Sequence, residues 1–439
     1  MRAGRDLRCW QRNIGSDCGP LSRGKPRPRS PRSADRLRPR RCRVRRRWND
    51  IPEDVGELPG GGHFGRSSDG KLNGLIYEPP ALLRLMAVAL PPTTPELMAK
   101  SLASYAKRAA ASGNTTLHEP GTIKPDWVAP LAKLSNTLAV RMSGSLNTDS
   151  VEASKTFASL GPGDKARKIP DSRFFALWHE IFWADGSNQA ESAAQTKPYL
   201  RSTERGKANY TVSQMVELCR AAKEAGWPFL IHCQGDAAID DALDAIEAAY
   251  GVHPVTGLNV LQHATLARQD QLERTKRLGA EITFLPDLLY LYGSAYRDQI
   301  LGPERAEFMV PMAACEKAGI AFSLHTDAPV SPAGPLRLVQ IAVTRRCVID
   351  NSVIGADQAI TIDEALKAIT IHAAPDWPRG LDRLARAGQG GRSDDPRERS
   401  LQSEPGRDRG HQVERDLGSG AADVRGLTSS LRLGRNRRQ

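Results

Sequence analysis

The sequence lacks the features that mark several large classes of protein. No apolar run approaches the roughly 20 residues that cross a bilayer, and no hydrophobic stretch follows the basic start of the chain. These absences argue against a membrane protein and a secretory signal, so we expect a cytoplasmic protein. The seven cysteines include no Cys-x-x-Cys pair, which argues against a disulfide framework and a zinc knuckle. No Gly-x-Ser-x-Gly elbow, Walker loop or dinucleotide-binding glycine pattern stands out.

The two ends of the chain are poor in lysine and rich in arginine. Residues 1–57 contain one lysine, Lys25, and no Phe or Tyr, whereas residues 381–439 contain no lysine at all. Such segments bury too little apolar surface to offset their chain entropy, so we expect disorder. Three origins are open: solvated tails, a nucleic-acid arm, or translation of GC-rich DNA out of frame. The lack of interleaved aromatics and of RGG spacing argues against nucleic acid.

Residues 58–380 repeat one pattern, in which a helical stretch ends in a glycine and a short apolar run follows. The glycines are Gly113, Gly226, Gly279 and Gly319. Each supplies the left-handed residue that ends a helix, and the alternation is typical of a parallel sheet buried on both faces. Strand candidates lie near residues 115, 140, 180, 230, 260, 283 and 322. A (β/α)8 barrel needs one more strand. We therefore predict an α/β fold, an incomplete (β/α)8 TIM barrel that lacks its first strand.

Three apolar runs end in residues that bind metals: FLIHCQGD carries His232, LNVLQHAT carries His263 and IAFSLHTDAP carries Asp327. Reactive side chains of barrel enzymes stand at the C-terminal ends of strands. A lone histidine in an apolar run is more often a packed core residue, but two on consecutive strands favour a site. Two neutral imidazoles and a carboxylate suit a divalent metal such as zinc, with Asp327 placed to take a proton from a metal-bound water. His325 lies on the same side of its strand as Asp327, and either supports this site or packs in the core.

Several segments resemble the YtcJ-like enzymes of the amidohydrolase superfamily. They are IHCQGDAAIDDALDAIE, LNVLQHATLARQDQLERTKRLG, AFSLHTDAPVSPAGPLRLVQ, DEALKAITIHAA, GGHFGRSSDGKLNGLIYEPPAL and FWADGSNQAESAAQTKPYL. The resemblance runs in order from about Gly60 to His372. It implies a metal-dependent hydrolase of amide or other non-peptide C–N bonds in a small molecule. It assigns His232 and His263 as metal ligands, and Asp327 as the residue that binds metal and activates water.

The resemblance also assigns lesser roles and reveals departures from the family. Gly235 and Asp236 are expected to shape the loop after their strand. Apart from the resemblance, the residue types of Asp185–Gln189 suit either contact with substrate or a turn after a strand. Ile181 stands where the family tends to carry a metal-bridging lysine. Neither the small β-rich domain that opens the family's sequences nor the first-strand His-x-His pair is found before Gly60, and an arginine-rich tail replaces the family's closing segment.

The sequence thus predicts three regions: 1–57 and 381–439, Arg-rich and either disordered or out of frame, and a partial hydrolase domain over 58–380. The out-of-frame origin is favoured because the resemblance starts and stops where the composition changes. The incomplete metal site predicts weak or no activity. The open barrel edge predicts aggregation or pairing with another chain, which includes a second copy in a homo-oligomer. The expected partner is a small-molecule substrate, with no membrane. The alternative is a non-catalytic fragment or a binding protein whose basic arms contact nucleic acid.

Overall fold

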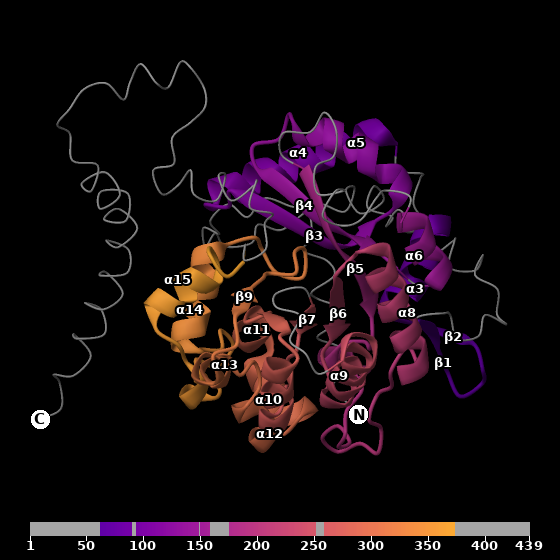
Figure 1. Cartoon of the computed structure of the whole chain (residues 1–439). Coiled ribbons are helices and arrows are strands. Elements are labelled where there is room, and N and C mark those ends of the chain that lie inside the picture. The colour runs from indigo at the N-terminus through magenta and orange to yellow at the C-terminus, as the bar shows by residue number, and fades with distance from the viewer. Residues whose placement is uncertain (1–61, 90–93, 149, 159–174, 252–258, 374–439) are drawn as a thin grey trace, which may run out of the picture. The chain divides into compact units, whose positions relative to one another are not determined.

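The computed structural model describes residues 62–89, 94–148, 150–158, 175–251 and 259–373 (Figure 1). The chain divides into two compact units, one made of residues 1–54 and 84–91 and the other of residues 55–83 and 92–439. The sheet and the site described below belong to the second unit. The predicted boundaries after residues 57 and 380, and the Arg-rich ends with their nucleic-acid hypothesis, lie outside the described residues.

A parallel sheet of seven strands, each paired with the next along the chain, forms the centre of the second unit. Its strands are β3 (Thr116–Ile123), β4 (Arg141–Asn147), β5 (Phe175–Trp183), β6 (Phe229–Cys233), β7 (Val260–His263), β8 (Glu281–Phe284) and β9 (Phe322–Leu324). All seven lie where the apolar runs predict them, so the parallel α/β prediction is confirmed. An eighth strand, which a closed barrel requires, is not among the described residues. The strands β1 (His63–Arg66) and β2 (Leu72–Tyr77) form a separate antiparallel hairpin.

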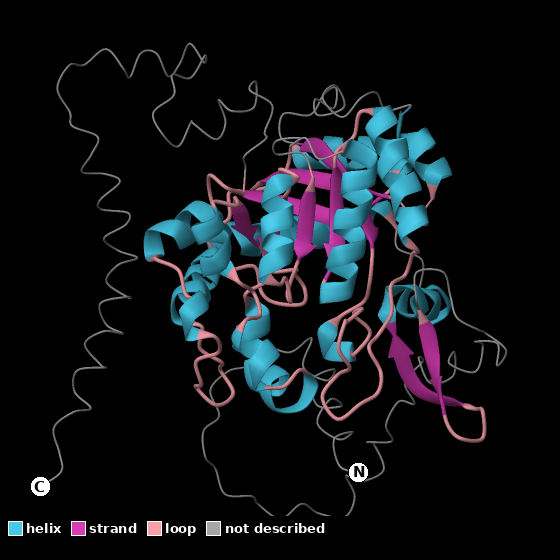
Figure 2. Cartoon of the chain, turned by 60° about the horizontal axis from the view of Figure 1, so that its bottom comes forward, coloured by secondary structure: helices cyan, strands magenta, loops and turns pink. Residues whose placement is uncertain are grey.

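In the second unit, helices alternate with the strands and pack around the sheet, as Figure 2 shows. The α-helices are α3 (Glu78–Ala89), α4 (Pro95–Ala111), α5 (Pro125–Ser135), α6 (Val151–Ala158), α8 (Val212–Ala225), α9 (Asp236–Tyr250), α10 (Gln269–Arg277), α11 (Asp287–Ala295), α12 (Pro303–Glu307), α13 (Met312–Ala318), α14 (Pro335–Thr344) and α15 (Ile362–Ala368). Short turns of other helix types are η3 (Asn188–Ala190), η4 (Tyr296–Ile300) and η5 (Ala356–Gln358). The helices α8 and α13 end at Gly226 and Gly319, whose φ angles of 78° and 66° are the predicted left-handed stops.

Strand register separates an apolar row from a more polar one. One row crosses five neighbouring strands and consists of buried apolar residues: Phe182, Ile231, Leu261, Ile282 and Phe322. The next row is Trp183, His232, Gln262, Thr283 and Ser323. Because successive residues of a strand point to opposite faces, the two rows lie on opposite sides of the sheet. Burial of each apolar side chain contributes about 1.5–3 kcal/mol to the stability of the fold, so the first row stabilises the sheet. The second row carries the polar groups.

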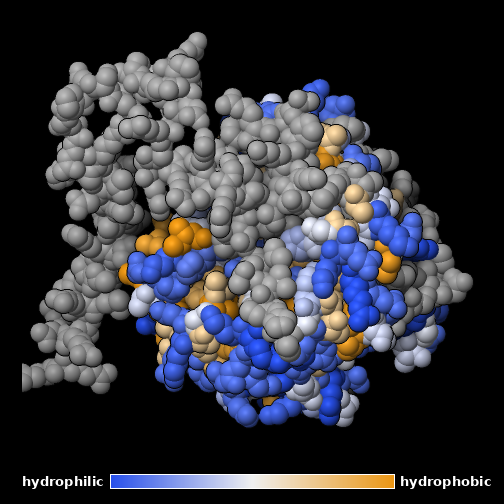
Figure 3. Space-filling view, viewed as in Figure 1, coloured by the Kyte–Doolittle hydropathy of each residue, from blue (hydrophilic) through white to orange (hydrophobic). Residues whose placement is uncertain are grey.

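The outer surface of the described residues is mostly hydrophilic in the view of Figure 3, with hydrophobic side chains in smaller patches. Exposed apolar side chains include Ile349 and Ile362. No helix in the described part of the chain has both the length and the apolar character that a membrane crossing needs.

Candidate active site

Three histidines meet at the C-terminal edge of the sheet. His232 is the fourth residue of β6, His263 is the last residue of β7, and His325 directly follows β9. The rings of His232 and His263 meet edge to face with their centroids 4.6 Å apart. The centroid of the His325 ring is 4.8 Å from that of His263. The structure therefore brings together the two histidines proposed as ligands and adds His325 to them.

The backbone is unusual at two of the predicted site residues. His263 has a φ of 69° and the following Ala264 a φ of 39°, while Asp327 has a φ of 50°. A left-handed conformation costs a non-glycine residue on the order of 1–3 kcal/mol and persists only where surrounding contacts enforce it. Here Ala264 donates its N–H to the carbonyl of Cys233 at 2.9 Å, which ties the end of β7 to β6. Strain of this kind concentrates at functional sites, and it supports a functional role for this edge.

Burial keeps the imidazoles of His263 and His325 neutral. His263 is 2% exposed, and burial lowers its pKa well below the ordinary value, with His232 and His325 lowering it further. Burial also lowers the pKa of His325 to about 4, although the charge of Asp327 opposes this shift. Neutral imidazoles present nitrogen lone pairs, which a metal ion or a substrate proton can use.

Two of the imidazole nitrogens suit a metal ion, but a complete ligand set is not formed. His263 Nδ1 and His325 Nε2 are buried and accept or donate no hydrogen bond among the described residues. Neutral imidazole with carboxylate is the donor chemistry that zinc prefers. Across the described segments, however, no three His, Cys, Asp or Glu side chains come together closely enough to hold an ion. The donors fit a divalent metal in kind, and their present geometry does not enclose one.

Ile181 occupies the position where the resemblance leads one to expect a lysine. Its side chain is fully buried in β5, and its residue pairs in register with Leu230 of β6. An aliphatic side chain cannot bind a metal. This strand therefore contributes apolar packing at that point instead of a ligand.

Asp185 holds the turn that follows β6. Asp185, just beyond β5, accepts hydrogen bonds from the N–H groups of Gln234 (2.9 Å), Gly235 (2.8 Å) and Ala194 (3.1 Å). A Cβ atom at Gly235 would overlap the backbone of Ala194, so the two segments touch where only glycine fits. This contact explains the glycine that the sequence places before Asp236.

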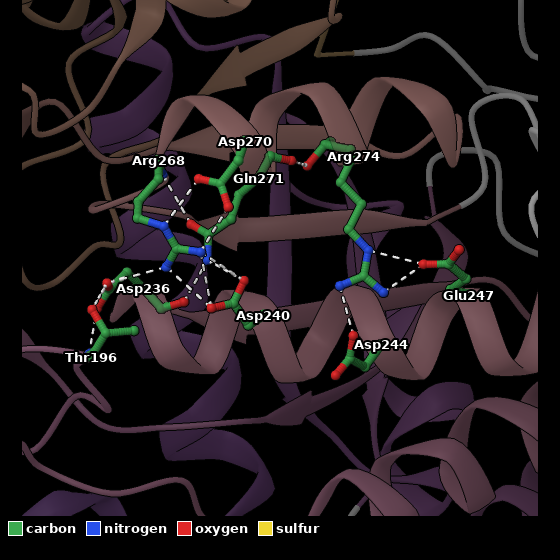
Figure 4. A network of polar contacts seen from close by, with 10 residues as sticks. Thr196, Asp236, Asp240, Asp244, Glu247, Arg268, Asp270, Gln271 and Arg274 are labelled. Atoms are coloured by element: carbon green, nitrogen blue, oxygen red, sulfur yellow. Dashed lines mark hydrogen bonds and ion pairs between the residues drawn. The ribbon is translucent and has the colours of Figure 1, made fainter.

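Asp236 begins α9 and lies in the polar network of Figure 4. It accepts hydrogen bonds from the N–H and the hydroxyl of Thr196, and from Arg268 at 3.2 Å. Arg268 also contacts Asp240 and Asp270. These partners connect the loops after β5, β6 and β7, so the contacts of Asp236 are those of a residue that orients loops.

His118 is a polar residue of the sheet that the sequence reasoning missed. It lies in β3, where Nδ1 is 2.9 Å from the hydroxyl of Ser143 and Nε2 is 3.1 Å from that of Ser145. The two serines are buried and alternate along β4, so they share one face. The signal was present: His118 lies in the apolar run after Gly113, as His232 does in the run after Gly226. Only its contact with the two serines of β4 could not be predicted from the sequence.

Comparison with known proteins identifies relatives of one chemical class. The model of the amidohydrolase family matches residues 44–375. The N-substituted formamide deformylase of Arthrobacter pascens is 29% identical over 39% of this chain and 32% of its own length. YtcJ of Bacillus subtilis (strain 168), named as an amidohydrolase, is 24% identical over 71% of this chain and 58% of its own. The chain thus spans about one third to three fifths of the curated relatives it matches.

Solved structures share the fold. An uncharacterized metal-dependent hydrolase from Pyrococcus horikoshii superposes with a TM-score of 0.59 at 22% identity, covering 75% of this chain and 64% of that one. One from Pyrococcus furiosus gives a TM-score of 0.57 at 22% identity, covering 74% and 63%. At this identity the similarity establishes the architecture of the sheet and its helices.

Proposed function

Because this chain belongs to the amidohydrolase family, we propose that it is a weakly active metal-dependent hydrolase of amide or other non-peptide C–N bonds in a small molecule. The observation that supports this most directly is the contact between the imidazole rings of His232 and His263 at the C-terminal edge of the sheet. A relative named for removing formyl groups from N-substituted formamides supports the same bond class.

We propose that His232, His263 and Asp327 hold the metal, and that zinc suits this donor set best. When bound, such an ion polarises a substrate carbonyl and makes water more acidic. Because no three donors converge in the described residues, the set would have to close around the ion.

The proposed role of Asp327 is proton transfer. Its carboxylate accepts a proton from the attacking water and passes it to the nitrogen that leaves, as a general base and then a general acid. His325 precedes it by two residues, and its unpaired buried Nε2 is available to bind the substrate. Transfer to the leaving nitrogen is required because an amine anion is too basic to depart from an amide unaided.

The test uses the whole chain, stripped of metal and then supplied with zinc. We expect zinc to bind the wild type and to restore amine release from a panel of N-substituted formamides. The variants His232→Ala, His263→Ala and Asp327→Ala should each lose zinc and activity together. The matched control is His63→Ala in strand β1 of the separate hairpin, which should retain both.

Two results would count against the proposal. One is zinc content in the His232→Ala and His263→Ala proteins equal to that of wild type. The other is amine release that proceeds equally well without any metal.

A further inference from the structure

Asp287 is a buried carboxylate beside the loop that carries Asp327. It is the first residue of α11, in the segment that follows β8, and it is 1% exposed. The loop that carries Asp327 follows β9 and ends where α14 begins at Pro335. Because β8 and β9 are neighbouring parallel strands, the segments that follow them emerge at the same edge of the sheet. Asp287 therefore lies at the edge that carries the candidate site, on a different strand from Asp327.

One oxygen of Asp287 makes its hydrogen bonds. Ser331 Oγ lies 2.6 Å from Asp287 Oδ2, and Arg337 Nη2 donates to the same oxygen at 3.0 Å. Arg337 Nη2 also donates to the carbonyl of Pro332 at 2.8 Å. The other oxygen, Oδ1, is buried and has no hydrogen-bond partner in the described part of the chain. A buried carboxylate is costly unless it is paired and hydrogen-bonded. Here both partners come from the stretch that follows Asp327.

Ser331 closes the base of the loop. Its Oγ is also 2.6 Å from the carbonyl oxygen of Thr326, the residue before Asp327, and its single proton can be donated to either oxygen. Within the loop, the N–H of Val330 donates to the carbonyl of Asp327 at 2.7 Å. Asp327 thus lies in a short loop whose two ends, Thr326 and Ser331, meet at the hydroxyl beside Asp287.

We propose that Asp287 is a positioning residue for Asp327, because it holds the loop after β9 and with it the backbone of that residue. The φ of Asp327 is 50°, a left-handed conformation that persists only where neighbouring contacts enforce it. Asp287 supplies such contacts from a separate strand and helix. The hold on the backbone does not depend on a metal. Its consequence for a metal or a proton at the Asp327 carboxylate rests on the proposed function.

Asp350 provides a matched control, because it binds a serine and an arginine as Asp287 does. It accepts hydrogen bonds from the hydroxyl of Ser352 at 2.7 Å and from Arg297 at 3.0 Å. These residues hold a turn between α14 and α15, and none of these contacts reaches the loop that carries Asp327. Loss of Asp350 should loosen its own turn and leave Asp327 in place. The pair separates the positioning of Asp327 from the general effect of losing such a carboxylate.

The experiment measures hydrogen exchange in the metal-free full chain, resolved to single amides by mass spectrometry. In Asp287→Asn, which removes the charge but keeps the shape, the Val330 amide should exchange at least about tenfold faster than in the wild type. The His325 amide donates to a carbonyl of β8 at 2.9 Å, and it should keep its rate because it belongs to the edge of the sheet. Asp350→Asn should leave both rates unchanged. Ser331→Ala is a second, milder variant, and it should also accelerate exchange at Val330.

Titration with zinc alone tests the consequence for the site. Asp287→Asn should weaken zinc binding by about 10- to 100-fold, the usual effect of losing the group that supports a metal ligand. Asp350→Asn should bind zinc as the wild type does. In the Asp327→Ala background, whose zinc affinity is already reduced, Asp287→Asn should have little further effect, because Asp287 acts through Asp327.

An unchanged exchange rate at Val330 in folded Asp287→Asn and Ser331→Ala overturns the inference. Equal acceleration at Val330 and His325 overturns it too, because the carboxylate would then support the whole edge of the sheet. If the wild type binds zinc, equal affinity in Asp287→Asn contradicts the positioning of the Asp327 carboxylate. A wild type without affinity for zinc contradicts the proposed function, and the exchange rates then decide the positioning role by themselves.

Discussion

The rings of His232 and His263 meet edge to face at 4.6 Å inside the described core. Two imidazolium ions at this distance would repel each other, and burial of His263 adds a desolvation cost to its charged form. The His263 ring is therefore held in its neutral form. Protonation of the buried histidines should therefore make the protein less stable in acid.

We expect the free energy of unfolding of the metal-free protein to fall as the pH drops from about 6.5 toward 4. Unfolded histidines take up protons near pH 6.5, whereas His325 resists until about pH 4 and His263 resists further. The unfolded state then binds more protons, and each such histidine removes up to about 1.4 kcal/mol per pH unit. Above about pH 7 both states are neutral at these groups, so no loss is expected there.

Urea unfolding at a series of pH values measures this effect. His325→Gln should show a shallower loss between about pH 6.5 and 4, and the control His63→Gln should follow the wild type. Carboxylates contribute equally to all three proteins, so the comparison isolates the histidine. If the unfolding free energy of His325→Gln and of the wild type fell equally steeply with pH, protonation of His325 would not be a cause of the acid destabilisation.

Replacement of Gly235 by alanine should destabilise the protein by sterics alone. Its φ of −84° is open to any residue, but a Cβ atom there would overlap the carbonyl of Ala194. Neither backbone can shift without breaking the hydrogen bonds to Asp185. We therefore expect Gly235→Ala to lower the free energy of unfolding by about 2–4 kcal/mol. Denaturant titration gives the value.

Gly70→Ala is the control for this change. Gly70 has a φ of 81°, and no atom lies within 4 Å of the place where an alanine Cβ would stand. Alanine there meets only backbone strain of about 1–2 kcal/mol. Equal losses at the two glycines would show that the contact with Ala194 is not tight.

Arg345 and Arg346 are adjacent arginines that should differ sharply in importance. Arg345 is fully buried and donates to the carbonyls of Ile354 (2.7 Å), Val310 (3.0 Å) and Met309 (2.7 Å). Lysine cannot make this fork of bonds and would leave buried carbonyls unpaired, so Arg345→Lys should cost about 3 kcal/mol or more. Arg346 is exposed, and Arg346→Lys should change the unfolding free energy by less than about 0.5 kcal/mol. Thermal unfolding followed by circular dichroism compares the two variants. A similar midpoint for both would contradict the claim that the hydrogen bonds of Arg345 to the three buried carbonyls stabilise the fold.

The positions of the strands, and of His232 and His263 at their ends, could be predicted from the local sequence. Helix–glycine–strand repeats fix where a parallel strand starts, and His232 and His263 lie at the ends of such runs. Boundaries were less exact: a strand was expected near residue 140, and β4 runs from Arg141 to Asn147. That difference arises because hydrogen bonding to neighbouring strands, and not hydrophobicity, sets the end of a strand.

Long-range pairings could not be predicted. The contacts of His118 join it to serines 25 and 27 residues away, and Asp185 reaches the turn at Gln234 across 49 residues. The left-handed backbone of His263 is equally invisible in sequence, because nothing in its side chain favours that conformation. Such features depend on how strands are brought together, which composition and periodicity do not specify.

The network around Arg268 in Figure 4 yields the last prediction. Arg268 donates to Asp236 (3.2 Å), Asp240 (3.0 Å) and Asp270 (2.9 Å), and its side chain is 35% exposed. In Arg268→Ala these three carboxylates lose their shared cation and repel one another. Because the site is partly exposed, solvent screens this repulsion, and we expect the free energy of unfolding to fall by about 1–2 kcal/mol.

Arg277 is the matched control, because it makes a 3.1 Å ion pair with Glu247 from a side chain that is 52% exposed. Arg277→Ala should cost less than about 0.5 kcal/mol. Urea unfolding at low and high salt measures both variants. Added salt should reduce the deficit of Arg268→Ala, because ions screen the carboxylates from one another. Equal stability of the two variants would mean that the network in Figure 4 does not hold the loops together.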